Sequence, residues 1–280
     1  MAKKKPSQLK VRLLGCTKDP VEVIYSAFRI CYSKDDAAQT WEKMRNGEIP
    51  RQTMVDFVAE KLGTGHTSPL RQVSFVFVVD GLSRACTAQF NRHHIGIERE
   101  EMSQRYVNFH KGIGAFVTPP SYKEHPEVLE RWETLQEDIL SFYDLCTSAG
   151  IKQEDARFAL PMGTVSREQF AMGFQAMQQF LDVRMCERAQ WEIREMAWQI
   201  FKLMKDEFPA LAKRLGIKCW ENRNLYCDED YAAYKECSWS RSRPHKEDLN
   251  QIWKQAKRDG PVNSQAFLVA HGWKAKKESS

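Results

Sequence analysis

The residues from Gln89 to Tyr106 form the part of the sequence richest in side chains that could bind an anion. Five of these eighteen residues are basic, and they are Arg92, His93, His94, Arg99 and Arg105. Arginine donates paired hydrogen bonds to phosphate oxygens, and serine and glutamine can supply further donors. So polar a run is most often a solvated helix face or loop. Its place after an apolar stretch, residues 73–79, favours a phosphate site held on a buried strand.

Two more arginines, Arg184 and Arg188, lie four residues apart in a stretch with helical periodicity. This spacing puts both guanidinium groups on one helix face, where like charges repel by roughly a few tenths of a kcal/mol. Either a bound anion offsets this repulsion, or neighbouring carboxylates do, namely those of Asp182, Glu187 and Glu192. Cys186 lies between the arginines and is more simply explained as a packed thiol than as a nucleophile.

The order of these residues resembles the signature of the flavin-dependent thymidylate synthases. That family's pattern is Arg-His-Arg, seven further residues, and then Ser-x-Arg-Tyr. This chain has Arg92-His93-His94, eight residues, and then Ser103-Gln104-Arg105-Tyr106, with Gln89 three residues before the first arginine. It departs from the pattern twice, because His94 replaces an arginine and one extra residue precedes Ser103.

Two further blocks occur in the family's order. Residues 65–70, Gly-His-Thr-Ser-Pro-Leu, resemble the family's Gly-His-x-Ser/Thr-Pro turn. The later block combines residues 155–161, Asp-Ala-Arg-Phe-Ala-Leu-Pro, with residues 184–194, Arg-Met-Cys-Glu-Arg-Ala-Gln-Trp-Glu-Ile-Arg. Because three blocks in register span residues 65–194, the resemblance is strong, and we assign residues 1–240 to a catalytic domain.

The resemblance implies a methyltransferase that converts dUMP to dTMP. Methylenetetrahydrofolate would supply the carbon, and FAD reduced by NADPH would supply the hydride, while the protein orients the reactants. Arg184 is implied as the catalytic residue, because the matching arginine contacts the uracil ring and favours its N3-deprotonated form. A fixed cation is suited to this role, since it stabilises charge that develops on the ring. The resemblance requires no protein nucleophile and no metal.

The resemblance also implies which side chains bind each ligand. The residues implied for dUMP are Gln89, Arg92, Glu101, Ser103, Gln104, Arg105, Arg157 and Arg184. The residues implied for FAD are His66, Ser68, Arg92, His93, His94, Glu101, Gln175 and Gln179. The flavin side departs most from the family, whose Asn-x-Arg is Gly173 and Gln175 here and whose later Asn is Gln179. Each lost charge-assisted hydrogen bond is worth roughly 1.5–3 kcal/mol, so either FAD binds more weakly or basic residues of another subunit substitute.

Two other functions remain open. The altered spacing before Ser103 is compatible with a relative that methylates or hydroxymethylates UMP or another pyrimidine nucleotide. The losses at positions 94, 173 and 175 are compatible with a non-catalytic relative that binds a nucleotide without flavin. Competition between dUMP and UMP, and flavin binding, distinguish these cases.

The family fold implied is α/β (α+β), with a central, mainly antiparallel sheet flanked by long helices. Apolar patterns predict strands at residues 9–16, at residues 73–79 before the turn Asp80-Gly81, and at residues 106–109. Helices are predicted at residues 20–31, 51–62 and 126–148. A further helical stretch is predicted from Ser166, with Gln169 in a capping-box position, past Trp191 toward Phe208 in two pieces.

The composition is typical of a compact cytoplasmic enzyme. A chain of 280 residues with 42% hydrophobic content can bury one sizeable core. No stretch approaches the ~20 apolar residues of a membrane span, and the lysines at the N-terminus precede no apolar signal sequence. The net charge of +5 arises in the C-terminal segment, so binding of nucleic acid is not expected. The resemblance implies a homotetramer.

The C-terminal residues 241–280 are predicted to form a basic, partly disordered extension with a short helix at residues 246–258. A solvated tail is the simplest role for it, and a subunit contact or a nucleic-acid arm is the alternative. Cys219, Cys227 and Cys237 have spacings that fit no common zinc site. The eight cysteines lack CxxC pairs and are predicted to be reduced thiols.

Overall fold

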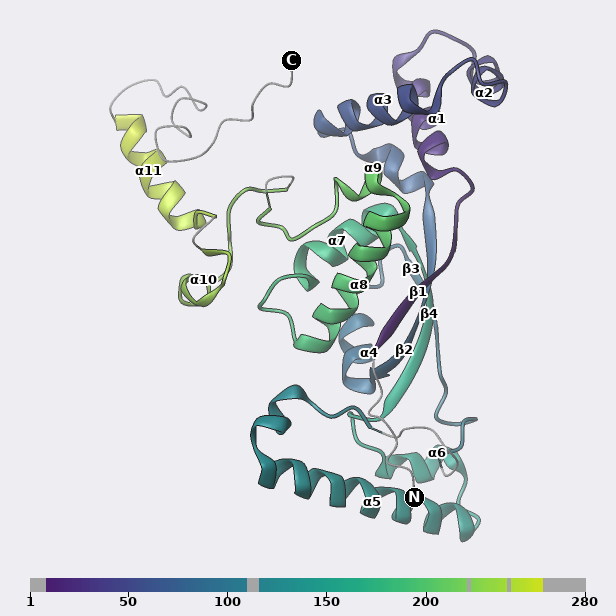
Figure 1. Ribbon diagram of the computed structural model, residues 1–280, viewed down its shortest axis with the longest axis vertical. Coiled ribbons are helices and arrows are strands. Elements are labelled where there is room, and N and C mark those ends of the chain that lie inside the picture. Colours follow the sequence, from purple (N-terminus) through teal and green to yellow (C-terminus); the bar gives the residue numbers. More distant parts are fainter. Residues whose placement is uncertain (1–8, 110–115, 221–222, 241–242, 259–280) are drawn as a thin grey trace. The chain divides into compact units, whose positions relative to one another are not determined.

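Four antiparallel strands form the centre of the fold (Figure 1). The computed structural model describes residues 9–109, 116–220, 223–240 and 243–258. In these residues the sheet order is β1-β2-β4-β3. The strands are β1 (Lys10–Cys16), β2 (Ser74–Ser83), β3 (Ile97–Glu101) and β4 (Val165–Gly173). The predicted antiparallel sheet and its first strand are therefore confirmed.

Strand β2 is longer than the sequence predicts, because Asp80-Gly81 does not end it. Gly81 has a φ of 79°, and the pairing with β4 shifts register between Asp80 and Leu82. An extra residue of this kind is a β-bulge, for which glycine with positive φ is suited. The strand therefore continues to Ser83, which becomes the N-cap of the next helix, α4 (Arg84–Phe90).

Strand β4 corrects the helix predicted from Ser166. Ser166, Glu168 and Phe170 are buried, whereas Arg167 and Gln169 are exposed. This period of two is that of a strand with one covered face. The spacing of Ser166 and Gln169 matched a capping box, but both residues pair with β2.

Strand β3 lies within the polar signature, residues 89–106. Residues 106–109, predicted as a strand, form a turn and irregular backbone, whereas β3 lies at Ile97–Glu101 and pairs with β4 from Met172 to Glu168. Four of the five residues of β3 are charged, so no apolar run marks it. The hydrogen bonds to β4 therefore determine where β3 forms.

Several helices match their predictions to within one residue. These are α1 (Pro20–Tyr32), α3 (Arg51–Gly63) and α5 (Pro126–Ser148). The predicted two-piece helix corresponds to α7 (Phe174–Arg184) and α8 (Trp191–Glu207). The shorter elements are α2 (Ala37–Arg45), α6 (Gln153–Ala156), α9 (Pro209–Ala212) and the 3₁₀ helices η1 (Ser68–Gln72), η2 (Pro120–Glu124) and η3 (Arg157–Ala159).

Helices α4, α7 and α8 pack on one side of the sheet (Figure 1). The core between them contains stacked and edge-on aromatic rings: Phe170 lies 5.5 Å from Phe77 and 4.9 Å from Phe90, and Phe90 lies 5.2 Å from Phe180. All four rings are buried. Burial of each such side chain contributes about 1.5–3 kcal/mol, so this core is a rigid support for the residues above it.

Contacts divide the chain into two compact units, Met1–Ile217 and Lys218–Ser280. The second unit contains α10 (Tyr231–Glu236) and α11 (Lys246–Arg258), which confirms the helix predicted at residues 246–258. His245 packs 4.7 Å from Tyr231, and its Nε2 lies 2.7 Å from the carbonyl oxygen of Glu229. Disorder predicted beyond residue 258 lies outside the described residues. The boundary predicted at residue 240 stays a prediction.

No helix in the described ranges is long and apolar enough to cross a membrane. Those same ranges hold no group of three or more His, Cys, Asp or Glu side chains placed to share a metal ion.

Candidate functional site

The signature segment and the C-terminal end of α7 meet through His93 and Arg184. The Nε of Arg184 donates a hydrogen bond of 2.8 Å to Nε2 of His93. The imidazole also packs edge-on against Phe180 at 5.1 Å, and its backbone N–H donates to the carbonyl of Phe90. The residue that the resemblance implies as catalytic, Arg184, is thus joined across 91 positions of sequence to His93, which the resemblance implies for FAD.

Burial and three neighbouring arginines hold His93 neutral. Burial, followed by the charges of Arg184, Arg99 and Arg92, lowers the pKa of His93 to about 4. At neutral pH the ring therefore carries one proton, which lies on Nδ1, because Nε2 accepts from Arg184. A neutral acceptor orients the guanidinium without cancelling its charge.

Arg184 is a half-buried cation in the last turn of α7. Burial lowers its pKa, and the nearby charge of Arg92 acts in the same direction. Arginine remains protonated in proteins, and the C-terminal end of a helix favours positive charge. The Nε is occupied by His93, which leaves the two Nη groups to face a ligand.

Arg99 fixes the loop that carries the histidines. Its Nη1 donates to Oδ1 of Asn91 at 2.7 Å, and its Nη2 donates to the carbonyl oxygen of His93. The guanidinium also lies 4.6 Å from the ring centre of Phe90. The family signature implies no specific role for Arg99, and its place on the same face of β3 as Glu101 becomes evident only from the strand pairing.

Glu101 is held on β3 by two donors. Its Oε1 accepts hydrogen bonds from Arg84 and, at 3.0 Å, from the hydroxyl of Ser166. The carboxylate that the resemblance places between dUMP and FAD is therefore oriented by α4 and β4. Sequence reasoning missed Arg84, because it lies outside the motifs and meets Glu101 only in the folded chain.

Glu192 does not neutralise Arg184, contrary to one explanation weighed above. Its carboxylate accepts from the backbone N–H of Ser83 at 2.6 Å and from the Ser83 hydroxyl at 2.5 Å. Burial raises the pKa of Glu192, and the two hydrogen bonds from Ser83 oppose that rise. The pair fastens α8 to the start of α4.

Glu168 is a second buried carboxyl group, on β4. It is 1% exposed, and neither side-chain oxygen has a hydrogen-bond donor within the ranges that the structure describes. The Nε of Arg99 lies 3.8 Å from its Oε1. Burial raises the pKa of Glu168 to about 7, and the attraction of Arg99 opposes this rise. Beside Arg99, β4 thus contributes one buried carboxyl group that lacks a hydrogen-bond donor in the described ranges.

The residues assigned to the nucleotide form a separate group beside α5 and α6. Arg105 makes an ion pair of 2.9 Å with Glu154, and the Nε of Arg157 donates to the carbonyl oxygen of the same glutamate at 3.1 Å. The hydroxyl of Ser103 accepts from the backbone N–H of Arg105 at 3.2 Å, and Gln104 is buried. The arrangement brings together four of the eight residues implied for dUMP, namely Ser103, Gln104, Arg105 and Arg157.

A small apolar cluster supports this group from below. It consists of Met102, Phe109, Tyr143 and Ala156, with Val107, Cys146 and Leu160 packed against it. Because Met102 immediately precedes Ser103, the cluster anchors the end of the signature to α5.

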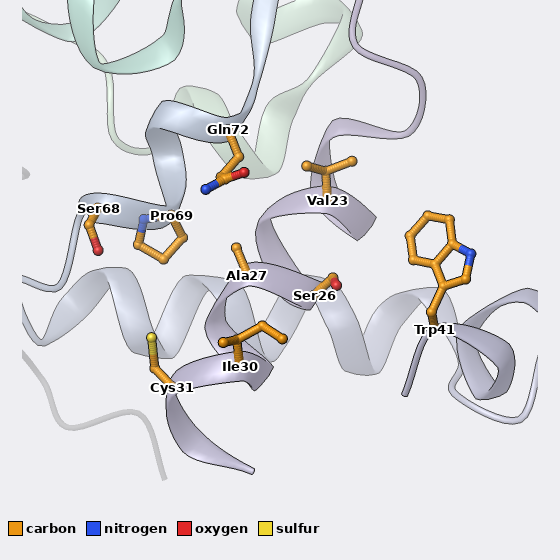
Figure 2. Close-up of a pocket in the computed structure, with 9 residues that line it drawn as sticks. All are labelled: Val23, Ser26, Ala27, Ile30, Cys31, Trp41, Ser68, Pro69 and Gln72. Carbon is orange, nitrogen blue, oxygen red and sulfur yellow. The ribbon is translucent and has the colours of Figure 1, made fainter. Parts of the chain in front are cut away.

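His66 and Ser68 form a third group near α1. The two ring nitrogens of His66 lie 2.8 Å from the hydroxyl of Tyr32 and 2.9 Å from that of Ser68. Ser68 also lines a pocket of about 420 Å³ between η1 and helices α1 and α2. Figure 2 shows Ser68 and Pro69 on one side of it and Trp41 on the other. Tyr32 and Trp41 are further candidate residues that the sequence did not indicate.

A fourth group lies at the start of α7. The Nε of Arg71 in η1 donates to Oε1 of Gln175 at 2.5 Å. The backbone N–H of Gly173 donates to the carbonyl of Gly96 at 3.1 Å, which brings the loop after His94 to the same helix end. Gln179 is exposed one turn further along α7.

The remaining implied residues connect these groups only in part. Gln89 lies in the last turn of α4, and Arg92 follows that helix and is close enough to act on the pKa of both His93 and Arg184. Exposed His94 lies 3.2 Å from the carbonyl of Arg92. Within the described ranges, no hydrogen bond or ion pair joins the Arg105 group to the His66 group.

Comparisons with known proteins agree with the motifs. The family model described as "Thymidylate synthase complementing protein" matches residues 12–210. The chain is 36% identical over 228 residues to a flavin-dependent thymidylate synthase of Nitratidesulfovibrio vulgaris, covering 79% of this chain and 91% of the relative. It is 33% identical over 241 residues to one of Thermococcus onnurineus, covering 84% and 95%.

A solved structure shares the fold. It is described as a UMP/dUMP methylase, PolB, from Streptomyces cacaoi bound with 5-Br dUMP. The TM-score is 0.62 at 20% identity, with 74% of this chain and 94% of that chain covered. The motifs, the mainly antiparallel sheet and the extent of the family match lead to one conclusion: the chain belongs to the family of the flavin-dependent thymidylate synthases.

Proposed function

We propose that this protein catalyses the reductive methylation of dUMP to dTMP. Methylenetetrahydrofolate donates the carbon, and FAD, when bound and reduced by NADPH, supplies the hydride. The observation that carries the proposal is the hydrogen bond between Arg184 and neutral His93, because it orients Arg184, the residue that the resemblance implies as catalytic. The names of the curated relatives support the same reaction.

The role proposed for Arg184 is to stabilise negative charge on the uracil ring. His93 occupies the Nε and leaves the Nη groups for the substrate. A cation that is oriented before the substrate binds needs no reorganisation as charge develops, which is the main source of electrostatic catalysis. The half-buried setting strengthens the effect, because water screens the charge less there.

The Arg105 group is proposed to hold the nucleotide, with Gln89, Arg92 and Glu101. Arg105 and Arg157 both face Glu154. A phosphate group would replace Glu154 as the partner of Arg105, because the guanidinium fork matches either anion. Ser103 and Gln104 supply neutral polar groups next to these arginines.

The described residues also fit a flavin. Ser68 lines a pocket of about 420 Å³, a volume in the range of small-molecule sites. Exposed Arg92 and His94 and the half-buried Gln175 present polar groups at the loop and at the start of α7. We therefore keep His66, Ser68, Arg92, His93, His94, Glu101, Gln175 and Gln179 as the proposed FAD-binding set.

UMP is a second candidate substrate. The signature has one residue more than the family pattern, and this stretch contains β3. The solved structure with the same fold is described as a UMP/dUMP methylase. A homotetramer belongs to the proposal on the strength of the resemblance alone, and a cytoplasmic location on the strength of the composition.

The test is the formation of methylated nucleotide from labelled methylenetetrahydrofolate, NADPH, FAD and equal dUMP and UMP. We expect label in dTMP and none with Arg184→Ala, which should still bind FAD. Label in methylated UMP instead would show that UMP, and not dUMP, is the substrate. Absence of label in both nucleotides, with folded protein and bound FAD, would contradict the proposed reaction.

A further inference from the structure

Arg71 places a positive charge beside Gln175, the position where the family has an arginine. We propose that Arg71 binds a phosphate group of FAD and that Gln175 positions it. The inference rests on the proposed function, since it concerns the FAD of that reaction. It assigns to this chain a cofactor contact that the family pattern does not contain.

The geometry gives Arg71 a fixed direction and unused donors. Its Nε donates to Oε1 of Gln175 at 2.5 Å, across 104 positions of sequence. Arg71 is exposed, and no carboxylate in the described ranges lies within ion-pairing distance of it. A guanidinium has five N–H donors, so the two Nη groups remain for an anion.

Arg71 stands on a rigid support shared with the proposed flavin residues. It belongs to the same 3₁₀ helix as Ser68, whose hydroxyl contacts His66. Between them, Pro69 and Leu70 are buried, and Leu70 is 0% exposed. The buried pair fixes the backbone of the turn, and the hydrogen bond to Gln175 directs the Arg71 side chain.

The partner of Arg71 is chemically suited to a cation that must stay available. The glutamine side chain accepts a hydrogen bond and carries no charge, whereas a carboxylate there would neutralise the arginine. The family has its cation at position 175, and this chain has one at position 71 that reaches the same place. The charge is therefore moved from α7 to η1 rather than lost.

A phosphate is the part of FAD that this arrangement recognises. The guanidinium fork pairs with phosphate oxygens bidentately, and such charge-assisted hydrogen bonds are about twice as strong as neutral ones. The alternative explanation is an exposed arginine that merely rests on a neighbouring glutamine. The two explanations predict different affinities for FAD.

The experiment is a titration of the full chain with FAD, in which quenching of the flavin fluorescence measures binding. We expect Arg71→Ala to weaken FAD binding by about tenfold to a hundredfold. The double variant Arg71→Gln with Gln175→Arg returns the cation to the family position and should bind within about threefold of the wild type. Arg131→Ala, which removes an exposed arginine of α5, is the matched control and should bind as the wild type does.

Each outcome decides between the explanations. Equal FAD affinity of the wild type and Arg71→Ala overturns the inference while leaving the proposed function intact. So does an equal loss in Arg71→Ala and Arg131→Ala, since it reports a general effect of removing positive charge. Failure of the wild type to bind FAD at all contradicts the flavin-dependent function itself. Thermal unfolding of each variant distinguishes a loss of FAD affinity from a loss of folded protein.

Discussion

The Nε of Arg184 lies 2.8 Å from Nε2 of His93, and the histidine is the acceptor in this hydrogen bond. The pKa of His93, lowered to about 4, keeps the acceptor nitrogen unprotonated across the neutral range. The family signature and the end of α7 thereby act as one unit, in which a neutral ring directs a cation.

Replacement of His93 by phenylalanine should remove the acceptor and keep the ring against Phe180. Without it the Arg184 side chain is free to rotate, so we expect kcat to fall by about tenfold or more. Steady-state kinetics with dUMP checks this. His125→Phe is the control, because His125 is an exposed histidine at the start of α5. An unchanged kcat in His93→Phe would remove His93 from the account.

The lowered pKa of His93 also predicts a loss of stability in acid. The unfolded chain takes up this proton near the ordinary pKa of 6.5, whereas the folded chain does so near 4. As pH falls from 6.5 to 4, the unfolded state therefore binds more protons, and the free energy of unfolding decreases. Urea unfolding over this range should show a smaller decrease for His93→Phe, and identical pH profiles would contradict the assignment.

The raised pKa of Glu168 predicts that the free energy of unfolding changes with pH in the opposite direction. Its folded pKa of about 7 lies above the ordinary 4.5, so the folded state binds the proton more tightly between these values. Stability is therefore lost as pH rises through that window. Glu168→Gln should be more stable than the wild type at pH 8, by about 1–3 kcal/mol, and the gain should shrink at pH 4.5. A destabilised variant at pH 8 would mean that ionised Glu168 is well satisfied.

Removal of the Ser83 hydroxyl should destabilise the fold by about 2 kcal/mol. Ser83→Ala deletes the N-cap of α4 and one of the two donors to the buried carboxylate of Glu192, while the backbone N–H donor remains. Asp36→Ala is the matched control, since Asp36 caps the exposed start of α2 without a buried partner and should cost about 1 kcal/mol. Equal losses in urea unfolding would show that the carboxylate of Glu192 does not depend on the serine.

The ion pair of Arg105 and Glu154 predicts opposite effects of its two members on nucleotide binding. Arg105→Ala should raise the KM for dUMP by about tenfold or more, because a charge-assisted contact to phosphate is lost. Glu154→Gln should lower the KM, because the competing carboxylate is removed. Arg12→Ala, from the exposed pair of Arg12 and Asp80 on the sheet, should leave the KM unchanged. A raised KM in Glu154→Gln would mean that the glutamate positions Arg105 instead of competing with phosphate.

The elements that the sequence predicts well are those with a single strong signal. Helix α5 begins at Pro126 and keeps apolar residues at helical spacing to Ser148, and its predicted limits are correct. Strand β4 is mistaken for a helix because Ser166, on its buried face, and Gln169, on its exposed face, have the spacing of a capping box. Strand β3 escaped notice because charged residues fill it. Both strands are stabilised by pairing with strands that are distant in the sequence, and local sequence patterns carry no information about that pairing.

The site shows the same division. The motifs brought His93, Glu101 and Arg184 forward by resemblance, and the structure places two of them in direct contact. Arg99 and Arg71 carried no motif, because their importance comes from neighbours such as the His93 carbonyl and Gln175. Contacts between residues about one hundred positions apart arise from the packing of β3, η1 and α7. Composition and spacing alone do not determine them.

The most direct test of the account is the visible absorbance spectrum of the purified protein after incubation with FAD, and then with NADPH and dUMP. We predict a bound flavin whose absorbance bleaches with NADPH, because the polar groups around Ser68, Gln175 and the His93 loop are proposed to hold it. Protein that retains no flavin under any condition would contradict the central claim, and would favour a relative that binds a nucleotide without flavin.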